Sequence, residues 1–344
     1  MNVLLTGGTG YIGSHTAVVL AQSGHKLTLF DNYSNSKPEV SCRIEQILGY
    51  PIATINGDIR DTDLLTKVMI SNGIDAVIHF AGLKAVGESS FIPIEYYSAN
   101  VQGTISLLQA MQKANVNSLV FSSSACVYGD PQYLPIDEAH PSNPASPYGR
   151  NKHQIEQLLQ DVAHSSFGKG DQTNLWRIVS LRYFNPVGAH ETGLIGEDPQ
   201  GIPNNLMPFV AQVAAGKLPI LNIYGNDYET SDGTGVRDYI HVMDLAEGHL
   251  AALNYLGLHS GFTSFNLGTG AGYSVLDMIK AFEKASKLQI PYQVQNRRTG
   301  DIASCYAKVD KAFAELHWQA KRDLDAMCQS AWAWQTYCNK LRQR

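Results

Sequence analysis

LLTGGTGYIGSH, residues 4–15, carries the strongest structural signal in the chain. It places Gly7, Gly10 and Gly13 in the spacing G-x-x-G-x-x-G, between the apolar start of the chain and a helix-like segment. Glycines between a strand and a helix permit a tight turn, let backbone N–H groups approach a pyrophosphate and let the helix pack closely on the strand. Three glycines alone are a weak signal, but this position makes the signal strong. We therefore predict a dinucleotide-binding turn.

The first 190 residues alternate short apolar runs with longer amphipathic segments. The runs are rich in Val, Ile, Leu and Phe, which is typical of strands that are buried on both faces of a parallel sheet. Helices between such strands cover the two faces. We therefore predict an α/β fold with a doubly wound, Rossmann-like parallel sheet.

The rhythm changes after Asn185, where long loops rich in Gly, Pro, Asp and Asn separate shorter helices and strands. Such loops in a compact enzyme are more often binding loops than simple connections. We predict a dinucleotide-binding domain over 1–185 and a smaller C-terminal α/β substrate-binding lobe mainly over 186–344, with a ligand cleft between them. Segments from about 236–265, which include VMDLAEGHLAALNYL, are expected to return to the first domain.

The composition of the 344 residues limits the partners. The hydrophobic fraction is 44%, the formal net charge is -5 and the pI is about 6.1, with no basic run that could follow a nucleic acid backbone. No apolar stretch has membrane-spanning length, and the N-terminus does not resemble a signal peptide, so we expect a cytoplasmic protein without a membrane partner. Five scattered cysteines without a C-x-x-C pair predict reduced thiols and no metal site.

The segment KLTLFDN, residues 26–32, ends the second predicted strand at Asp31, 18 positions after Gly13. A carboxylate there can accept hydrogen bonds from adenosine ribose hydroxyls and repels a 2'-phosphate, so it favours NAD over NADP. Asp58, after the third strand, suits an adenine contact. For both aspartates the alternative is a plain turn or cap residue. Ala81 and Gly82, after the fourth strand, would let the cofactor pass close to the backbone.

SPYGRNK, residues 146–152, opens a predicted helix after a proline-rich segment, and it places Tyr148 and Lys152 on one face. FSSSACVYGD ends another predicted strand, and Ser124 within it would face the same cleft. The charge of Lys152 can lower the pKa of the Tyr148 phenol, while Ser124 binds a substrate hydroxyl. The alternatives are a packed tyrosine beside a solvated lysine and an ordinary loop serine. The combination of all three favours a proton-transfer site.

The glycine turn, Ser124 and the Tyr148-x-x-x-Lys152 pair resemble the extended short-chain dehydrogenase/reductase family. Further segments are similar to the branch formed by the UDP-glucose 4-epimerases, over almost the whole chain: FAGLKAVGES, SSSACVYGD, LRYFNPVGAH, GEDPQGIPNNLMP, GTGVRDYIHVMDLA and FNLGTG. The resemblance implies that UDP-glucose and UDP-galactose are interconverted through a 4-keto sugar with tightly bound NAD. It also implies a homodimer formed through helices of the first domain.

The same resemblance implies the residues of the site. It implies Tyr148, Lys152 and Ser124 as catalytic residues, with Tyr148 taking the proton of the sugar 4-hydroxyl. NAD contacts are implied at Gly7, Gly10, Tyr11, Ile12, Gly13, Asp31, Asn32, Asp58, Ile59, Phe80, Ala81, Gly82, Lys84, Asn100, Tyr148, Lys152 and Phe184. UDP-sugar contacts are implied at Ser124, Asn185, Asn204, Asn205, Leu206, Tyr224, Arg237, Tyr239, Arg298, Asp301 and Cys305.

Within that last set, Tyr224 would stack near the uracil, and Arg237, Tyr239, Arg298 and Asp301 would hold the diphosphate and ribose. The planar fork of arginine suits a diphosphate because it offers two parallel charged hydrogen bonds. A surface salt bridge is the alternative for either arginine.

Cys305 matches a position beside the sugar 2-carbon where some members of the family carry tyrosine. A small side chain leaves space for an N-acetyl group, so we predict activity on UDP-GlcNAc and UDP-GalNAc as well. The alternative is a buried thiol without a role in substrate choice.

Three other functions remain to be weighed. Nucleotide-sugar 4,6-dehydratases resemble this chain but carry an Asp-Glu pair where it has Ala125 and Cys126, and elimination of water needs that acid and base. A dehydrogenase that releases NADH is less favoured because the loops resemble those of an epimerase. A non-catalytic NAD-binding protein is disfavoured because Tyr148, Lys152 and Ser124 are all present.

Overall fold

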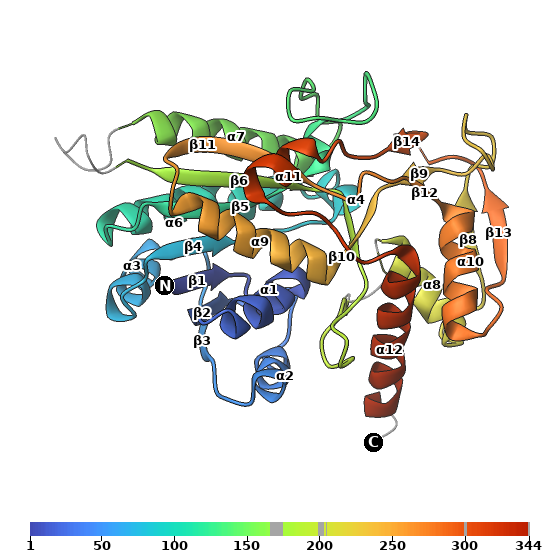
Figure 1. The fold of residues 1–344 in the computed structure, drawn as a ribbon, viewed down its shortest axis with the longest axis horizontal. Coiled ribbons are helices and arrows are strands. Elements are labelled where there is room, and N and C mark those ends of the chain that lie inside the picture. The colour runs from blue at the N-terminus through green and yellow to red at the C-terminus, as the bar shows by residue number, and fades with distance from the viewer. Residues whose placement is uncertain (166–174, 199–202, 204, 299–300, 343–344) are drawn as a thin grey trace.

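The structure, a computed structural model, describes residues 1–165, 175–198, 203, 205–298 and 301–342. A seven-stranded sheet, parallel throughout, forms its centre (Figure 1). The strand order is β11 (Gly261–Leu267), β6 (Arg177–Tyr183), β5 (Ser118–Ser124), β4 (Ala76–His79), β1 (Asn2–Thr6), β2 (Lys26–Asp31) and β3 (Ala53–Asn56). The order reverses between β1 and β4, which is the topological switch point where such folds bind ligands. The predicted doubly wound α/β fold is confirmed.

Helices cover both faces of this sheet because successive strand residues are apolar, so that side chains on each face need to be buried. Val3 and Leu5 point into a core with α1 (Tyr11–Gln22), α2 (Glu39–Leu48) and α9 (Val242–Leu256), whereas Leu4 points into the opposite core. The elements that cover the opposite face are α3 (Thr62–Ser71), α6 (Gly103–Lys113) and α7 (Pro147–His164). Between β4 and α6 the chain forms α4 (Val86–Ser89), α5 (Pro93–Tyr96) and the π-helical turn η1 (Tyr97–Gln102).

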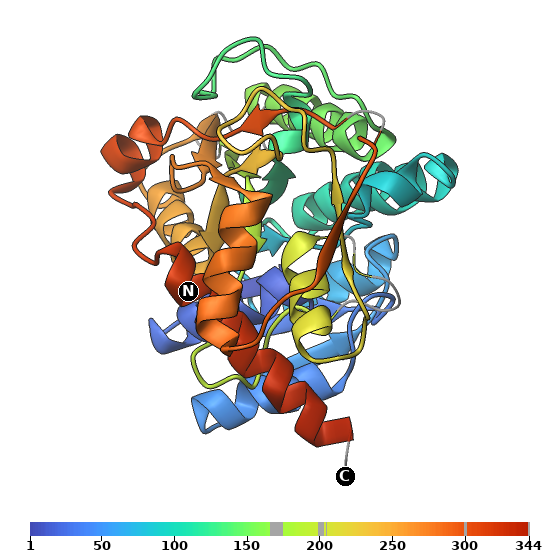
Figure 2. The ribbon, with the colours of Figure 1, turned by 90° about the vertical axis from the view of Figure 1, so that its right-hand side faces the viewer.

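The second lobe packs beside the sheet and has its own apolar core (Figures 1 and 2). Its helices are α8 (Leu206–Ala214), α10 (Val275–Ser286) and α12 (Leu324–Arg342). Ser274 starts α10 with a capping box, in which its hydroxyl and the Asp277 carboxylate each accept the other's backbone N–H. Three small sheets pair β8 (Leu221–Tyr224) with β13 (Tyr292–Gln295), β7 (Asn185–Val187) with β10 (Tyr239–His241), and β9 (Val236–Arg237) with both β12 (Tyr273–Ser274) and β14 (Ser304–Cys305).

The segment 236–265 is divided between the two parts. β9 belongs to the three-stranded sheet, whereas α9 packs against α1 and β11 forms the edge of the seven-stranded sheet. The short helix α11 (Asp310–Leu316) also packs on α9 and β11 (Figure 1). The division at residues 185 and 186 into two functional domains stays a prediction.

No helix in the described ranges is long and apolar enough to cross a membrane.

Candidate functional site

The glycine turn lies between β1 and α1, at the switch point of the sheet. Gly7 has a φ of +69°, and its N–H donates to the Phe30 carbonyl at 2.7 Å. A Cβ on Gly13 would lie 2.3 Å from the Gly7 carbonyl oxygen, so a larger residue would displace the turn. Helix α1 has no side-chain cap and no acidic residue in its first turn. Its first N–H groups and its dipole therefore fit an anionic pyrophosphate.

Asp31 stands at the end of β2, directly beside this turn. Its carboxylate accepts hydrogen bonds from the N–H of Thr9 at 3.1 Å, the N–H of Tyr33 at 2.9 Å and the Ser36 hydroxyl at 3.0 Å. Asp31 therefore caps a local turn and at the same time lies next to the glycine turn. Its contact with ribose stays a prediction.

Asp58 follows β3 and lies next to Asn32. It accepts hydrogen bonds from Arg60 at 2.8 and 2.7 Å and from the Asn32 amide at 3.2 Å. The hydrogen bond from Arg60 holds the pKa of the Asp58 carboxyl at about 2. Ile59 is buried, with its side chain against Gly103. Asp58 is thus an ionised acceptor near the end of β2.

The segment after β4 closes the other side of the glycine turn. The N–H groups of Phe80 and Ala81 donate to the Thr6 carbonyl at 2.9 and 3.0 Å. A Cβ on Gly7 would lie 2.7 Å from the Ala81 nitrogen. Gly82, with a φ of +153°, has no room for a side chain because its Cβ would lie 2.7 Å from the Asn100 amide oxygen.

Asn100, in η1, holds this segment in place. Its amide oxygen accepts the Leu83 N–H at 2.7 Å, and its amide nitrogen donates to the Leu83 carbonyl at 3.1 Å and to the Asn151 side chain on α7 at 3.3 Å. The implied NAD contact of Asn100 stays a prediction. What the structure shows is a brace between the residues after β4 and α7, which the sequence pattern did not indicate.

Tyr148, Lys152 and Ser124 come together where α7 passes the end of β5. Helix α7 begins at Pro147, and the Ser146 hydroxyl caps it by accepting the Gly149 N–H at 3.1 Å. Tyr148 and Lys152 are buried on one face, 9% and 6% exposed. The Lys152 ammonium donates to the Ser122 carbonyl at 2.6 Å and lies 5.8 Å from the Tyr148 ring centroid. Ser124 ends β5, is half-buried, and acts to lower the pKa of the Tyr148 phenol.

Burial dominates the electrostatics of this cluster. It raises the pKa of Tyr148 well above its ordinary value, assisted by Cys126 and opposed by Ser124. It lowers the pKa of Lys152 to about 8, with the Glu156 carboxylate opposing the change. The lysine therefore still carries most of its charge at pH 7. In the protein alone the phenol stays neutral, so a further positive charge close to it is needed before it can lose a proton near neutral pH.

Cys126 is a neighbour of this cluster that we did not predict. Its N–H donates to the Ser124 hydroxyl at 3.2 Å. Burial raises the pKa of its thiol, while Ser124, Arg237 and Lys152 act in the opposite direction. The sequence signal was its place two positions after Ser124 at the end of a strand.

Two of the implied UDP-sugar residues are linked electrostatically to this region. Arg237 on β9 is the register partner of Cys305 on β14. Burial raises the pKa of the Cys305 thiol to about 12, with Arg237 opposing and Cys126 reinforcing the shift. Asn185, at the start of β7, donates its N–H to the Asp238 carbonyl at 2.9 Å, next to Arg237. Phe184 is buried in a small apolar cluster against which Cys305 packs.

Other implied residues form a second, more exposed group. The Arg298 guanidinium lies 4.7 Å from the Tyr224 ring centroid and 2.8 Å from the Asp301 carboxylate.

The remaining implied residues lie elsewhere. Tyr239 is 3% exposed and packs in the core of the second lobe, so its side chain is largely inaccessible. Asn205 precedes α8, which begins at Leu206, and its amide donates to the Glu197 carboxylate at 3.0 Å. Asn204 lies outside the described residues.

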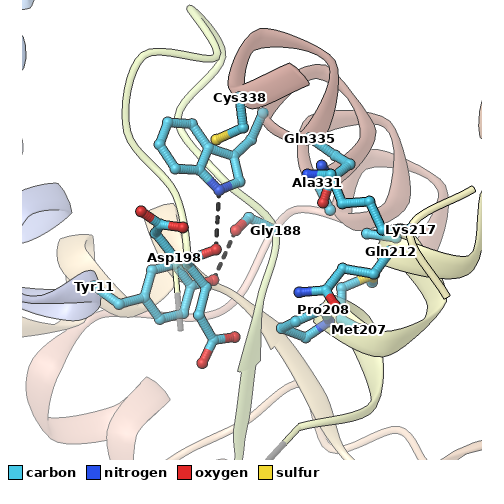
Figure 3. A pocket seen from close by; sticks show the side chains of 13 residues that line it. Tyr11, Gly188, Asp198, Met207, Pro208, Gln212, Lys217, Ala331, Gln335 and Cys338 are labelled. Atoms are coloured by element: carbon cyan, nitrogen blue, oxygen red, sulfur yellow. Dashed lines mark hydrogen bonds between the residues drawn. The ribbon is translucent and has the colours of Figure 1, made fainter. Parts of the chain in front are cut away.

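A pocket of about 400 Å³ lies where the two lobes meet (Figure 3). The Tyr11 hydroxyl donates to the Gly188 carbonyl at 2.7 Å, and the Trp334 indole donates to the Glu197 carbonyl at 2.9 Å. The Lys84 ammonium lies 3.2 Å from the Glu197 carboxylate. Tyr11 and Glu197 line the pocket, but Ser124, Tyr148 and Lys152 do not belong to its lining. The pocket therefore lies between the lobes beside Tyr11 of the glycine turn, apart from Ser124, Tyr148 and Lys152.

A glycine turn that fits a pyrophosphate lies at the same edge of the sheet as half-buried Ser124 and buried Tyr148 and Lys152, an arrangement typical of dinucleotide-dependent enzymes. Residues 3–268 match the model of the NAD dependent epimerase/dehydratase family. The chain is 53% identical to the UDP-glucose 4-epimerase of Bacillus subtilis (strain 168) over 336 residues, which cover 98% of this chain and 97% of that one. It is 53% identical to the UDP-glucose 4-epimerase of Homo sapiens over 340 residues, with coverages of 97% and 96%. The chain belongs to the NAD dependent epimerase/dehydratase family.

Solved structures agree with this assignment. The crystal structure of UDP-glucose-4-epimerase from Stenotrophomonas maltophila, with bound NAD and formylated UDP-arabinopyranose, has a TM-score of 0.95 at 48% identity and covers 99% of both chains. The enzyme from Bifidobacterium longum, in complex with NAD+ and UDP, has a TM-score of 0.91 at 52% identity and covers 98% of both chains. The predicted family resemblance is confirmed.

Proposed function

We propose that the protein is a UDP-glucose 4-epimerase, which inverts carbon 4 of the sugar to interconvert UDP-glucose and UDP-galactose. The observation that carries this proposal is that half-buried Ser124 and buried Tyr148 and Lys152 meet at the same edge of the sheet as the glycine turn. The names of the relatives support it, and two similar structures hold NAD together with UDP or a UDP-sugar derivative.

The residues around β1 and β2 fit NAD. Gly7, Gly10 and Gly13 leave room for a pyrophosphate at the start of α1, and Asp31, which ends β2 beside this turn, would accept hydrogen bonds from the ribose. Bound there, NAD would supply a reversible hydride acceptor for carbon 4 of the sugar and a positive charge near the buried phenol.

The proton steps belong to the chain. Ser124 holds the sugar 4-hydroxyl, and the Tyr148 phenolate oxygen takes the hydroxyl proton as the 4-keto sugar forms. Lys152 keeps a positive charge next to this oxygen throughout. Tyr148 then returns the proton to the inverted hydroxyl, so that one residue serves both halves of a reaction without net oxidation.

The second lobe must hold the nucleotide while the hexose turns over. Arg237 is placed for the diphosphate near the catalytic cluster, and Arg298, with Tyr224 and Asp301, for the outer part of the nucleotide. In this proposal 186–344 is mainly the UDP-sugar lobe and 1–185 the NAD domain. Firm binding of parts of the substrate that do not react leaves the reacting ring free to rotate.

Cys305 extends the substrate range in this proposal. It lies in register with Arg237, and its side chain is small. We therefore include UDP-GlcNAc and UDP-GalNAc among the substrates, because the space that tyrosine would fill can take an N-acetyl group.

Exposed apolar side chains around α4 and α5 favour a homodimer. Phe91 is 87% exposed and Ile94 79% exposed, and Val86, Ile92 and Ile105 are also exposed. Several exposed apolar side chains close together are typical of a protein–protein contact. A second copy of this chain is the occupant that the family resemblance suggests.

Sedimentation equilibrium tests the homodimer. Phe91→Ser/Ile94→Ser should yield monomers at micromolar concentration, because polar side chains weaken an apolar contact. Leu258→Ser, which changes an 84% exposed leucine elsewhere, should leave the dimer intact. A monomeric unsubstituted protein would refute the proposal.

The reaction is tested by incubating the purified protein with UDP-galactose and no added NAD. Formation of UDP-glucose would support both the epimerase and the tightly bound cofactor. Failure even with NAD supplied would remove the proposal. A 4-keto-6-deoxy sugar would instead identify a dehydratase, which the absence of an acidic pair at Ala125 and Cys126 disfavours.

A further inference from the structure

Glu156 lies on α7 one turn beyond Lys152 and is only 4% exposed. Its carboxylate accepts hydrogen bonds from the Ser180 hydroxyl at 2.8 Å and from Arg182 at 3.0 Å (Nε) and 2.7 Å (Nη2). The side chains of Arg182 and Glu156 are 9% and 5% exposed. Burying two charges costs desolvation free energy that a packed apolar pair would avoid, so such a pair is weak evidence for stability. Because Glu156 lies on α7, the helix that carries Tyr148 and Lys152, its pairing indicates a role in the site.

Arg182 extends the contact beyond the helix. The guanidinium also donates to the Tyr128 hydroxyl at 2.9 Å and to the Glu138 carbonyl at 3.2 Å. Tyr128 donates in turn to the Asn266 side chain at 2.7 Å, and the Asn266 N–H donates to the Glu138 carboxylate at 2.8 Å. The network therefore connects α7 with β6, with β11 and with the loop after β5, and each of these connections is buried or half-buried.

Residues 148, 152 and 156 are successive members of an i, i+4 row, so they share one face of α7. Glu156 is the third residue of this row, and its bidentate hydrogen bond with Arg182 leaves α7 little freedom to rotate about its axis. The first two members are held less directly: the Tyr148 N–H donates to the Ser89 hydroxyl oxygen at 3.2 Å, and the Lys152 ammonium donates to one carbonyl. The orientation of the reacting pair thus depends on the third.

We propose that Glu156 is a positioning residue for Tyr148 and Lys152. Held by Arg182 and Ser180, it fixes the rotation of α7 and places a negative charge one turn behind the Lys152 ammonium. This inference rests on the proposed epimerase reaction, in which the two residues handle the proton.

The groups that face Lys152 agree with this role. Its neighbours are His79 on β4, Cys126 after β5, and Tyr148 and Glu156 on α7. Burial and Lys152 lower the pKa of His79 to about 3, so this imidazole is neutral at the working pH. Burial also keeps the Cys126 thiol and the Tyr148 phenol protonated in the protein alone. Glu156 thus opposes the effect of burial on Lys152, while its own carboxylate is paired with the Arg182 guanidinium.

The direction of the pH effect follows. Burial has already lowered the pKa of Lys152, and the Glu156 charge opposes that shift. Without Glu156 the lysine should lose its proton at a lower pH. The alkaline limb of the kcat profile is the fall in kcat at high pH, where Lys152 loses the charge next to Tyr148. This limb should therefore move to lower pH.

The test uses the holoenzyme with Glu156→Gln and with Glu156→Gln/Arg182→Met, since the double variant leaves no unpaired buried cation and is expected to fold. For both we expect kcat on UDP-galactose to fall about tenfold or more, KM to stay within about twofold, and the alkaline limb to move down by about half a pH unit or more. A double variant that folds with wild-type kcat and a wild-type limb overturns the proposal.

Asp244→Asn/Arg322→Met is the matched control. Asp244, on α9, is fully buried and pairs with Arg322, so its loss should destabilise the fold in a comparable way. We expect a lower midpoint of thermal unfolding with an unchanged pH profile. An equal shift of the limb in this control also overturns the proposal, because the effect would then be a general loss of stability.

A second readout separates this inference from the proposed function. NMR titration of protein carrying carbon-13-labelled lysine, with the Lys152 signal assigned by Lys152→Met, measures the pKa of Lys152 without turnover. A lower value in both Glu156 variants supports the inference, and an unchanged value contradicts it. If the unsubstituted holoenzyme does not epimerise UDP-galactose, the proposed function fails, while this titration still decides the role of Glu156.

Discussion

The two groups of implied site residues differ in how they are held. Tyr148 and Lys152 are 9% and 6% exposed and rise from a helix anchored to the sheet. Tyr224 is 39% exposed, and the side chain of Arg298 is 59% exposed and contacts Tyr224 and Asp301. Burial shifts the pKa values of Tyr148 and Lys152, whereas water screens the charges of the second group. We therefore expect substitutions in the first group to reduce turnover strongly, and substitutions in the second group to have small effects on KM.

Tyr148→Phe should have the largest effect. Removing the hydroxyl leaves the packing of the ring but no proton acceptor, so kcat should fall by about 10²–10⁴-fold while NAD stays bound. Turnover of UDP-galactose and the NAD content of the purified variant measure the two parts. Near-normal turnover would remove Tyr148 from the proposed role.

Three features of the site could be predicted because their signals are local. The glycine turn, the strand end at Asp31 and the start of α7 before Tyr148 each depend on residues a few positions apart, and the structure places all three as expected.

The features we missed depend on distant residues. Glu156 meets Arg182 26 positions away, and Tyr128 meets Asn266 138 positions away. The brace at Asn100 joins two segments that are brought together only by the sheet. No local pattern predicts which buried polar group will meet which partner, since the packing of the strands decides it.

Cys305→Tyr should have the next largest effect, and a selective one. The larger ring fills the space that we assign to an N-acetyl group, so kcat/KM for UDP-GlcNAc should fall by about 100-fold, while the value for UDP-galactose stays within a few-fold. Parallel assays on the two sugars measure the ratio. Cys305→Ser is the matched control and should keep both activities. Absence of UDP-GlcNAc turnover in the unsubstituted enzyme would refute the assignment.

Arg298→Ala should have the smallest effect. The side chain lies mostly in water, and it must give up a screened ion pair with Asp301 in order to contact the substrate. We therefore expect KM to rise by only about two- to tenfold with kcat unchanged. Added salt should reduce the difference from wild type, because exposed charges are screened.

Arg237→Ala is the comparison within the same lobe. Its guanidinium acts on the half-buried thiols Cys126 and Cys305, so KM should rise more and respond less to salt. If both arginine variants behaved alike, exposure would not separate the two groups of residues, and the second lobe would have to hold the nucleotide as one unit.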